Sequence, residues 1–319
     1  MKIYKSIVLF IVFFLLLESL LRIFSYPSTY TSIYKIDDDL GYSLRNGKHK
    51  INANGEVHHI NIIENNNADV IILGDGLISG FDLKNNNYLS DRVSDELQLN
   101  AVNLSVPGYG TVQQLIILDR YLSKADTVPK YVFIVYNFSN DYFDNVQKWE
   151  GLRVPTIRFE NNKIDIINPV LPSKSMIFIR HLAWNSRVFS LYKEMVRSNL
   201  RKADTINERQ EVLFSEFDGI GDIKTKLAIQ GIEGIRKKYG FNIVWLGWHD
   251  TPLEEKQKLN SNVADVKLRS FLPMEHKMIN IETNGGYWKE RYLHPKTRHL
   301  NKNSIDLIVD LIVNNKNDY

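Results

Sequence analysis

The chain of 319 residues contains no cysteine. This absence excludes a disulfide framework, a thiol nucleophile and a metal site with cysteine ligands, and it fits an extracytoplasmic bacterial protein. An excess of charge of either sign is also missing, because 40 lysines and arginines stand against 37 aspartates and glutamates, giving a formal net charge of +3. Since there is no long basic run either, we predict no nucleic-acid partner.

Three further signals are absent from the sequence. It has no internal repeat and no glycine-rich loop long enough to cradle phosphate groups. Compact zinc motifs carry ligands at the helical spacing i, i+4, and the candidate ligands do not show it: His249, His276, His294, His299 and Asp75. We therefore predict neither a metal nor another cofactor.

One long apolar run is present near the first residues of the chain. A basic leader, Met1–Lys5, precedes an apolar stretch from Ile7 to Phe24, which could just cross a bilayer at ~1.5 Å per residue. No small-x-small cleavage site follows, so we favour an uncleaved signal anchor over residues 1–24; the alternatives are a cleaved signal peptide and a buried core helix. The lysines should stay in the cytoplasm. We predict a single-pass protein of the bacterial cell membrane with an extracytoplasmic C-terminal domain.

The remaining chain divides into a short first part and a long second part. Residues 25–67 lack long periodic runs, and we expect a stalk and a small cap with a short strand at Val57–Ile63. From residue 68 to 319, continuous apolar segments alternate with helix-length segments, which is typical of a buried parallel sheet with helices on both faces. The expected strands are Val70–Leu73, Ala101–Leu104, Tyr131–Tyr136, Asn242–Leu246 and Met278–Ile281. The expected helices are Tyr88–Leu97, Val112–Leu122, Ile223–Tyr239, Glu254–Arg269 and Ile305–Val313.

This pattern predicts a three-layer α/β/α sandwich with a mainly parallel central sheet, preceded by the membrane helix. The alternation breaks over about 142–216, which we interpret as an inserted region. Within it, aromatic and basic residues recur at helical spacing over Met176–Arg201. We favour a helix that packs its apolar stripe on the core; a substrate-facing lid or a membrane-surface helix is the alternative.

The segment Val70–Gly80 is an apolar strand that runs into a tight polar turn, the place where α/β folds assemble their sites. With its triplet Gly74-Asp75-Gly76, it resembles the first motif of the SGNH (GDSL) hydrolase superfamily of esterases and acyl-transfer enzymes. The family has its nucleophilic serine where this chain has Gly76. Asp75 is expected to stabilise the turn through local hydrogen bonds.

The other motifs of this family follow in order, over about 230 residues. Val102–Gln114 is similar to the second motif, and Val132–Asp141 is similar to the third. Thr297–Ser304 is similar to the last motif, in which His299 matches the catalytic histidine. The resemblance implies a flavodoxin-like fold and an oxyanion hole formed by Gly76, Gly108 and Asn140.

A second departure from the family lies just before that histidine. Lys296 and Thr297 occupy the positions where the family has an aspartate, and neither can orient an imidazole as a carboxylate does. Asp250, which follows an expected strand, is a candidate replacement for this acid partner of His299.

The resemblance and the two losses support two hypotheses. The first is a catalytically impaired relative that binds acylated, for example O-acetylated, cell-surface carbohydrate or an assembly partner. The second is an active carbohydrate esterase or O-acyltransferase that uses His299, with a water or Ser79 as nucleophile. An oxyanion hole and binding alone can leave ~10³–10⁴-fold catalysis over water, so weak hydrolysis is physically allowed.

Overall fold

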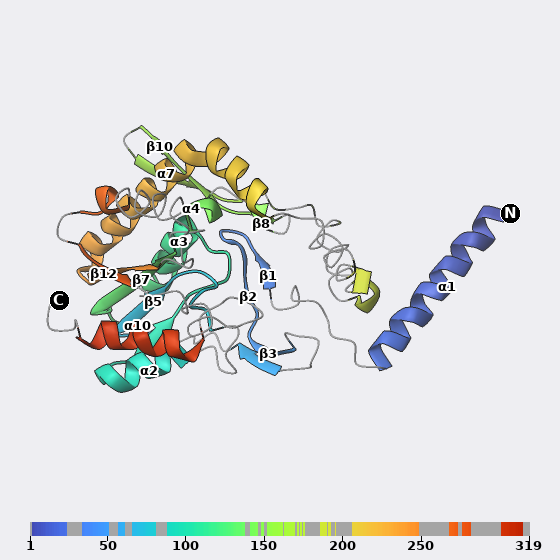
Figure 1. Ribbon diagram of the computed structural model, residues 1–319, viewed down its shortest axis with the longest axis horizontal. Helices are drawn as coiled ribbons and strands as arrows, with labels where there is room; N and C mark the ends of the chain where they lie inside the picture. Colours follow the sequence, from blue (N-terminus) through green and yellow to red (C-terminus); the bar gives the residue numbers. More distant parts are fainter. Residues whose placement is uncertain are drawn as a thin grey trace.

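The centre of the protein is a five-stranded sheet in which all neighbouring strands run parallel (Figure 1). Its strands are β5 (Val70–Leu73), β6 (Ala101–Asn103), β7 (Tyr131–Asn137), β12 (Asn242–Trp248) and β13 (Lys277–Ile281). Their spatial order is β6-β5-β7-β12-β13, which is the order 2-1-3-4-5 of flavodoxin-like folds. The computed structural model describes residues 2–23, 34–50, 57–60, 66–80, 88–137, 141–145, 148–149, 152–161, 163–169, 171, 173, 175, 186–189, 191–192, 195, 206–248, 268–273, 276–281 and 301–314.

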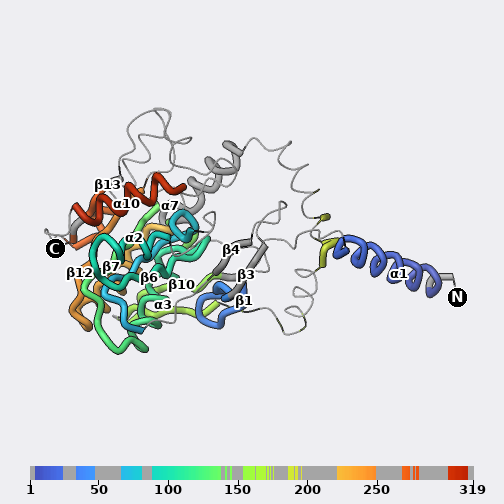
Figure 2. Tube along the Cα trace, turned by 90° about the horizontal axis from the view of Figure 1, so that it is seen from below, coloured from blue at the N-terminus to red at the C-terminus, as the bar shows by residue number. Residues whose placement is uncertain are grey.

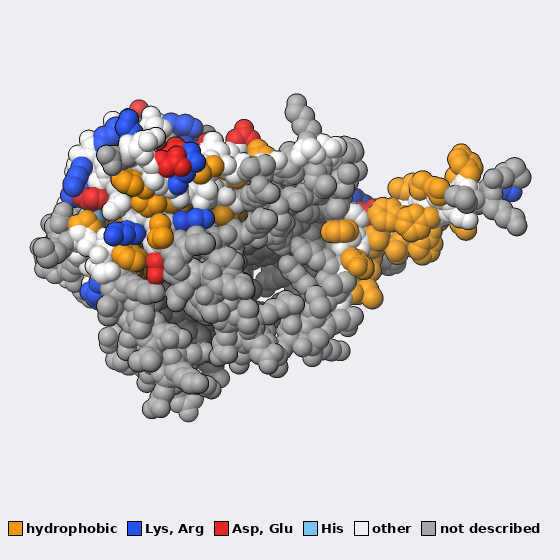
Figure 3. Space-filling model, turned by 90° about the horizontal axis from the view of Figure 1, so that it is seen from above, with side chains coloured by type: hydrophobic (Ala, Val, Ile, Leu, Met, Phe, Trp, Pro, Cys, Tyr) orange, Lys and Arg blue, Asp and Glu red, His pale blue; other side chains and the backbone are white. Residues whose placement is uncertain are grey.

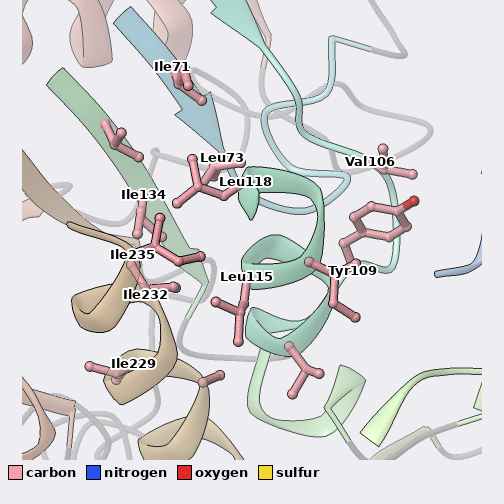
Figure 4. Close-up of a cluster of buried hydrophobic side chains, with 14 of the residues drawn as sticks. Ile71, Leu73, Val106, Tyr109, Leu115, Leu118, Ile134, Ile229, Ile232 and Ile235 are labelled. Atoms are coloured by element: carbon pink, nitrogen blue, oxygen red, sulfur yellow. The ribbon is translucent and has the colours of Figure 1, made fainter. Parts of the chain in front are cut away.

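Each face of the sheet is covered by helices because side chains alternate along every strand. One face carries α3 (Thr111–Leu122) and α7 (Ile206–Tyr239). The other face carries α2 (Tyr88–Leu97) and α10 (Lys302–Asn314). Figure 4 shows the first of these cores, where side chains of α3 and α7 meet those of β5 and β7: Ile71, Leu73, Leu115, Leu118, Ile134, Ile229, Ile232 and Ile235. The predicted three-layer sandwich is confirmed.

The elements of the core agree with the sequence pattern except in their ends. The long helix α7 begins at Ile206, well before the expected Ile223. Its glycines at 219 and 221 lower helix propensity and conceal the earlier turns in the sequence pattern. The helix expected at Glu254–Arg269 lies mostly outside the described residues.

Short antiparallel hairpins surround this core. The expected strand Val57–Ile63 is observed as β4 (Val57–Ile60), which pairs with β3 (Gly47–Lys50). The inserted region contributes α4 (Asp141–Asp144) and two hairpins, β8–β9 and β10–β11. Their strands are Lys148–Trp149, Leu152–Arg153, Thr156–Glu160 and Lys163–Ile167, and β10 contacts α7.

The hairpin of β1 (Tyr34–Asp37) and β2 (Gly41–Leu44) is part of the main core. The Tyr42 hydroxyl donates to the Pro107 carbonyl oxygen at 3.0 Å, and the Tyr109 hydroxyl donates to the Tyr42 carbonyl oxygen at 2.7 Å. Arg120 on α3 forms ion pairs with Asp37 and Asp39, each with a 2.7 Å contact. This portion of the segment expected to form a stalk and cap therefore supports the loop that follows β6.

Helix α1 (Lys2–Ile23) extends away from the sheet domain in two perpendicular views (Figures 1 and 2). Its residues Tyr4–Ile23 have a mean hydropathy of 2.4 in their most apolar window, and none of that window is buried. Figure 3 shows hydrophobic side chains covering this helix. Its length and composition fit a membrane anchor or a signal sequence.

Candidate functional site

The candidate site lies at the carboxyl ends of β5 and β7. From β5 the chain continues to β6 on one side, whereas from β7 it continues to β12 on the other. In open α/β sheets, ligands bind in the crevice at such a switch point. The turn 74–80 follows β5, and α4 comes after β7 in the chain, so both approach this crevice.

The turn after β5 is closely packed and held by local hydrogen bonds. A Cβ atom on Gly74 would lie 2.8 Å from Ile78 Cδ1 and 3.1 Å from the Val135 carbonyl oxygen, so a larger residue would have to displace the Ile78 side chain and press on the β7 backbone. Asp75 Oδ1 accepts a hydrogen bond from the Leu77 N–H at 2.8 Å, confirming the expected local stabilisation.

Ser79, the alternative nucleophile, lies in the same turn and is buried. Its hydroxyl donates to the Gly76 carbonyl oxygen at 3.0 Å. Direct attack by this hydroxyl would require it to leave that bond and move out of the buried turn.

The turn after β6 contains the predicted oxyanion donor Gly108. The Tyr109 N–H donates to the Val106 carbonyl oxygen at 3.1 Å, and Gly108 has a φ of 78°. Proline at the second position and a positive φ at the third define a type II turn, in which glycine is strongly preferred. The type II turn therefore explains why the sequence motif contains Pro107 followed by Gly108.

Two hydrogen bonds hold the turns after β5 and β6 side by side. The Val106 N–H donates to the Gly74 carbonyl oxygen at 3.3 Å, and Asn103 Nδ2 donates to the Ile78 carbonyl oxygen at 2.9 Å. Among the described residues, the N–H groups of Gly76 and Gly108 have no hydrogen-bond partner. The two predicted backbone donors thus lie on adjoining turns, Gly76 in a buried and Gly108 in a half-buried position.

Three acidic side chains meet at this end of the sheet, and we refer to Asp75, Asp141 and Asp144 as the three-carboxylate cluster. One oxygen atom from each lies within 4.8 Å of the others. Asp141 Oδ2 accepts hydrogen bonds from the Asn137 N–H at 3.2 Å and from Gln114 Nε2 at 3.4 Å. Asn137 Nδ2 also donates to Asp75 Oδ2 at 3.5 Å, so Asn137 bridges two members of the cluster.

The cluster binds protons strongly. Burial raises the pKa of Asp141 well above its ordinary value, the charges of Asp75 and Asp144 raise it further, and the hydrogen bonds from Asn137 and Gln114 oppose the shift. Burial, assisted by the charge of Asp75, raises the pKa of Asp144 to about 8. At neutral pH the cluster therefore carries fewer than three negative charges.

A hard cation is the other way to neutralise such a cluster, because Mg²⁺ and Ca²⁺ prefer carboxylate oxygens. Because Asp141 and Asp144 have raised pKa values, bound protons can reduce the charge of the cluster without a metal ion. The absence of a metal stays a prediction. His276 does not belong to this site. Its Nε2 lies 2.7 Å from Glu233 Oε2, next to the amino end of β13.

Asn145 fixes the position of α4, which carries two members of the cluster. Its Oδ1 accepts from the Val112 N–H at 3.0 Å, and its Nδ2 donates to Thr225 Oγ1 on α7 at 2.8 Å. A Cβ atom on Gly110 would lie 2.5 Å from Asn145 Oδ1, so glycine is needed where α4 meets the start of α3. The acidic residues of α4 are therefore held by a rigid contact.

The structure brings together three of the predicted site residues, namely Asp75, Gly76 and Gly108. His299, Asn140 and Asp250 lie outside the described residues. Sequence reasoning missed Asn137, Gln114 and the acidic pair of α4. The available signal was the segment Asp141-Tyr-Phe-Asp144 close behind a buried strand, which places two acids one helical turn apart.

No protein-family model matches the chain, and no curated protein matches its sequence. Among solved structures, an acetyl xylan esterase from the rumen bacterium Butyrivibrio proteoclasticus shares 9% identity, with a TM-score of 0.38 over 84% of this chain and 68% of that one. A lipase from a goat rumen metagenome shares 13% identity, with a TM-score of 0.41 over 76% and 93%. A GDSL-like lipase from Bacteroides thetaiotaomicron shares 9% identity, with a TM-score of 0.34 over 78% and 87%.

These three structures come from esterases and lipases, one of them described as GDSL-like. At identities this low, any assignment of function depends on the residues of this chain.

Proposed function

We propose that the chain is a membrane-anchored, extracytoplasmic bacterial protein of the SGNH-hydrolase type that has lost its nucleophile and serves as a binding protein. Its ligand is an acylated molecule, with O-acetylated cell-surface carbohydrate as the leading candidate. An assembly partner is the other candidate. The observation that carries the proposal is a switch-point site in which, within the described part of the chain, the N–H groups of Gly76 and Gly108 have no hydrogen-bond partner, while position 76 has no side chain.

At position 76 only the side chain of the nucleophile is missing, because the backbone there has a conformation that serine could adopt. Among the described glycines, positive φ angles occur at Gly41, Gly80, Gly108 and Gly240, so Gly76 has a φ that serine can also adopt. Ser79 is no ready substitute because its hydroxyl is buried and donates within the turn. An acyl-enzyme route therefore has no attacking atom at its usual position.

Binding of an ester does not need that atom. An ester or acetyl carbonyl oxygen accepts hydrogen bonds, and two adjacent N–H groups can hold it in one orientation. Partial burial of the site strengthens such bonds relative to water. The same donors that would stabilise an oxyanion can thus recognise the uncharged carbonyl group.

The three-carboxylate cluster favours a second candidate, hydrolysis by direct attack of water. A general acid or base works best with a pKa near the operating pH, and Asp144 has a pKa of about 8. In this scheme His299 takes the proton of the attacking water, while protonated Asp144 gives a proton to the departing alkoxide. The acid and the alcohol are the products.

An acetyl-ester hydrolysis assay on the purified full chain separates the two candidates. For the binding protein, we expect no turnover above background with the chain as it stands. Hydrolysis that appears only in Gly76→Ser would show that the pocket is preserved and lacks the nucleophile. Gly234→Ser is the matched control, since an added Cβ there meets nothing within 4 Å. Turnover that disappears in both His299→Ala and Asp144→Asn would establish the water mechanism and refute the binding-only role.

Calorimetric titration tests the ligand itself. We expect an O-acetylated oligosaccharide to bind, and the same oligosaccharide after alkaline deacetylation to bind at least tenfold more weakly, because it lacks the carbonyl acceptors. Equal affinity for both would rule out acyl recognition by this site.

A further inference from the structure

Glu18 is an acidic residue within the apolar helix α1, and its carboxylate is almost fully enclosed. Only 12% of its side chain is exposed, whereas apolar neighbours such as Leu16 and Leu20 are at least half exposed. A charge at this depth in a membrane helix is costly unless it is paired, and such residues mark functional positions. The enclosure of Glu18 therefore needs a partner.

The partner is the start of the segment 186–195, which belongs to the inserted region. Glu18 Oε2 accepts from Ser186 Oγ at 2.9 Å and from the Val188 N–H at 3.1 Å, and Oε1 accepts from the Arg187 N–H at 3.0 Å. These N–H groups belong to the first helical residues of the segment, where a carboxylate is favoured by both hydrogen bonding and the helix dipole. Figures 1 and 2 show this segment beside the end of α1.

The segment that binds Glu18 also has an exposed apolar face. Phe189 is 43% exposed, Tyr192 63% and Met195 58%, and they recur every three residues along one side of the segment. The rings of Phe189 and Tyr192 lie 6.4 Å apart. Figure 3 shows hydrophobic side chains continuing from α1 onto the surface beside it.

The depth of the contact matches a helix in the membrane plane. Glu18 lies five residues before Ile23, the last residue of α1, which corresponds to roughly 7.5 Å along the helix axis. In-plane amphipathic helices lie about 5–10 Å deep, at the boundary between headgroups and acyl chains. Aromatic rings are favoured at that level.

Charge points to the same location. Arg187 Nε and Nη1 are buried and have no hydrogen-bond partner among the described residues. Arg22, at the same end of α1, pairs with Glu18 at 2.8 Å. Both guanidinium groups thus lie beside the Glu18 carboxylate and place basic side chains at the level of the lipid headgroups.

We infer that α1 is retained in the folded protein and that residues 186–195, docked on Glu18, lie in the outer membrane–water interface with Phe189 and Tyr192 in contact with lipid. This inference rests on the membrane anchoring in the proposed function. It makes the membrane helix a structural part of the extracytoplasmic domain, so that the docked segment holds the domain at a fixed height above the bilayer.

Because the chain has no cysteine, single cysteines can report the depth of chosen positions directly. The test places an environment-sensitive fluorophore at Phe189→Cys or Tyr192→Cys in the full chain, reconstituted in vesicles of phosphatidylcholine and phosphatidylglycerol. Lys163→Cys, on the exposed β10–β11 hairpin, is the matched control. We expect quenching by spin-labelled lipid to be several-fold stronger at 189 and 192 than at 163, and quenching by aqueous iodide to be several-fold weaker.

Glu18→Ala should reduce the lipid quenching at 192 towards the level at 163, and Glu18→Gln should retain part of it because an amide oxygen still accepts. Flotation and the intact mass are measured on the same samples. A chain that does not float with the vesicles contradicts the anchoring itself. A chain that floats while position 192 stays as open to iodide as position 163, or a mature chain whose mass lacks α1, overturns the docking inference and leaves the ligand site unaffected.

Discussion

Replacing Asp144 by asparagine should remove a pH dependence of stability that originates in the three-carboxylate cluster. The ordinary pKa of an aspartate is 3.8, and burial together with the charge of Asp75 raises that of Asp144 to about 8 in the folded protein. Above pH 4 the folded state therefore binds a proton that the unfolded state releases. This favours folding at low pH, and the advantage is lost as the pH rises through about 8.

The size of the effect follows from these two values. At pH 7 the folded state still has about 1.4 kcal/mol of this proton-linked stabilisation, and at pH 9 less than about 0.1 kcal/mol remains. Between pH 7 and pH 9, the free energy of unfolding should thus fall by about 1.4 kcal/mol more for the unaltered chain than for Asp144→Asn. Asparagine keeps the shape of the side chain and cannot ionise.

Urea unfolding of the full chain in detergent micelles at pH 7 and pH 9 measures this difference. Trp245 and Trp248 are fully buried in β12, so tryptophan fluorescence reports the opening of the core. Asp310→Asn, at an exposed position of α10, is the matched control and should leave the pH dependence unchanged. The reasoning is refuted if Asp144→Asn and the unaltered chain lose the same stability between the two pH values.

Three other outcomes follow from the same structure. Gly110→Ala should lower the free energy of unfolding by about 1–3 kcal/mol through its clash with Asn145, whereas Gly234→Ala should raise it by about 0.5–1 kcal/mol through helix propensity; equal urea midpoints would contradict the packing described. Arg120→Met should cost about 1–2 kcal/mol at pH 6, and the loss should shrink from pH 4 towards pH 2. The reason is that, against the opposing effect of burial, Arg120 together with the Leu40 and Asp39 N–H groups lowers the pKa of Asp37 to about 2; a loss independent of pH would exclude the ion pair as its source. Millimolar Mg²⁺ or Ca²⁺ at pH 7 should leave the thermal midpoint unchanged, since protons bound by Asp141 and Asp144 already reduce the negative charge of the three-carboxylate cluster, and a rise that Asp144→Asn abolishes would instead establish a cation site.

The sequence predicted the core sheet well because strands buried on both faces are continuous apolar runs that only a few folds accommodate. Val70–Leu73 is buried along its whole length, as the pattern requires. Glycine was equally informative where the geometry disfavours a side chain, through a close contact at Gly74 and a positive φ at Gly108. Hairpins such as β10–β11 were missed because their exposed residues leave little alternation to detect.

Composition and local pattern alone thus determined the α/β class, the apolar helix α1 and the two glycine turns, since each depends on neighbouring residues. The tertiary structure decided which residues from distant parts of the chain come into contact. Asn137 reaches Asp75 across 62 residues, and Ser186 reaches Glu18 across 168. The raised pKa of Asp144 likewise depends on burial and on the charge of Asp75 in the turn after β5, which no local pattern encodes.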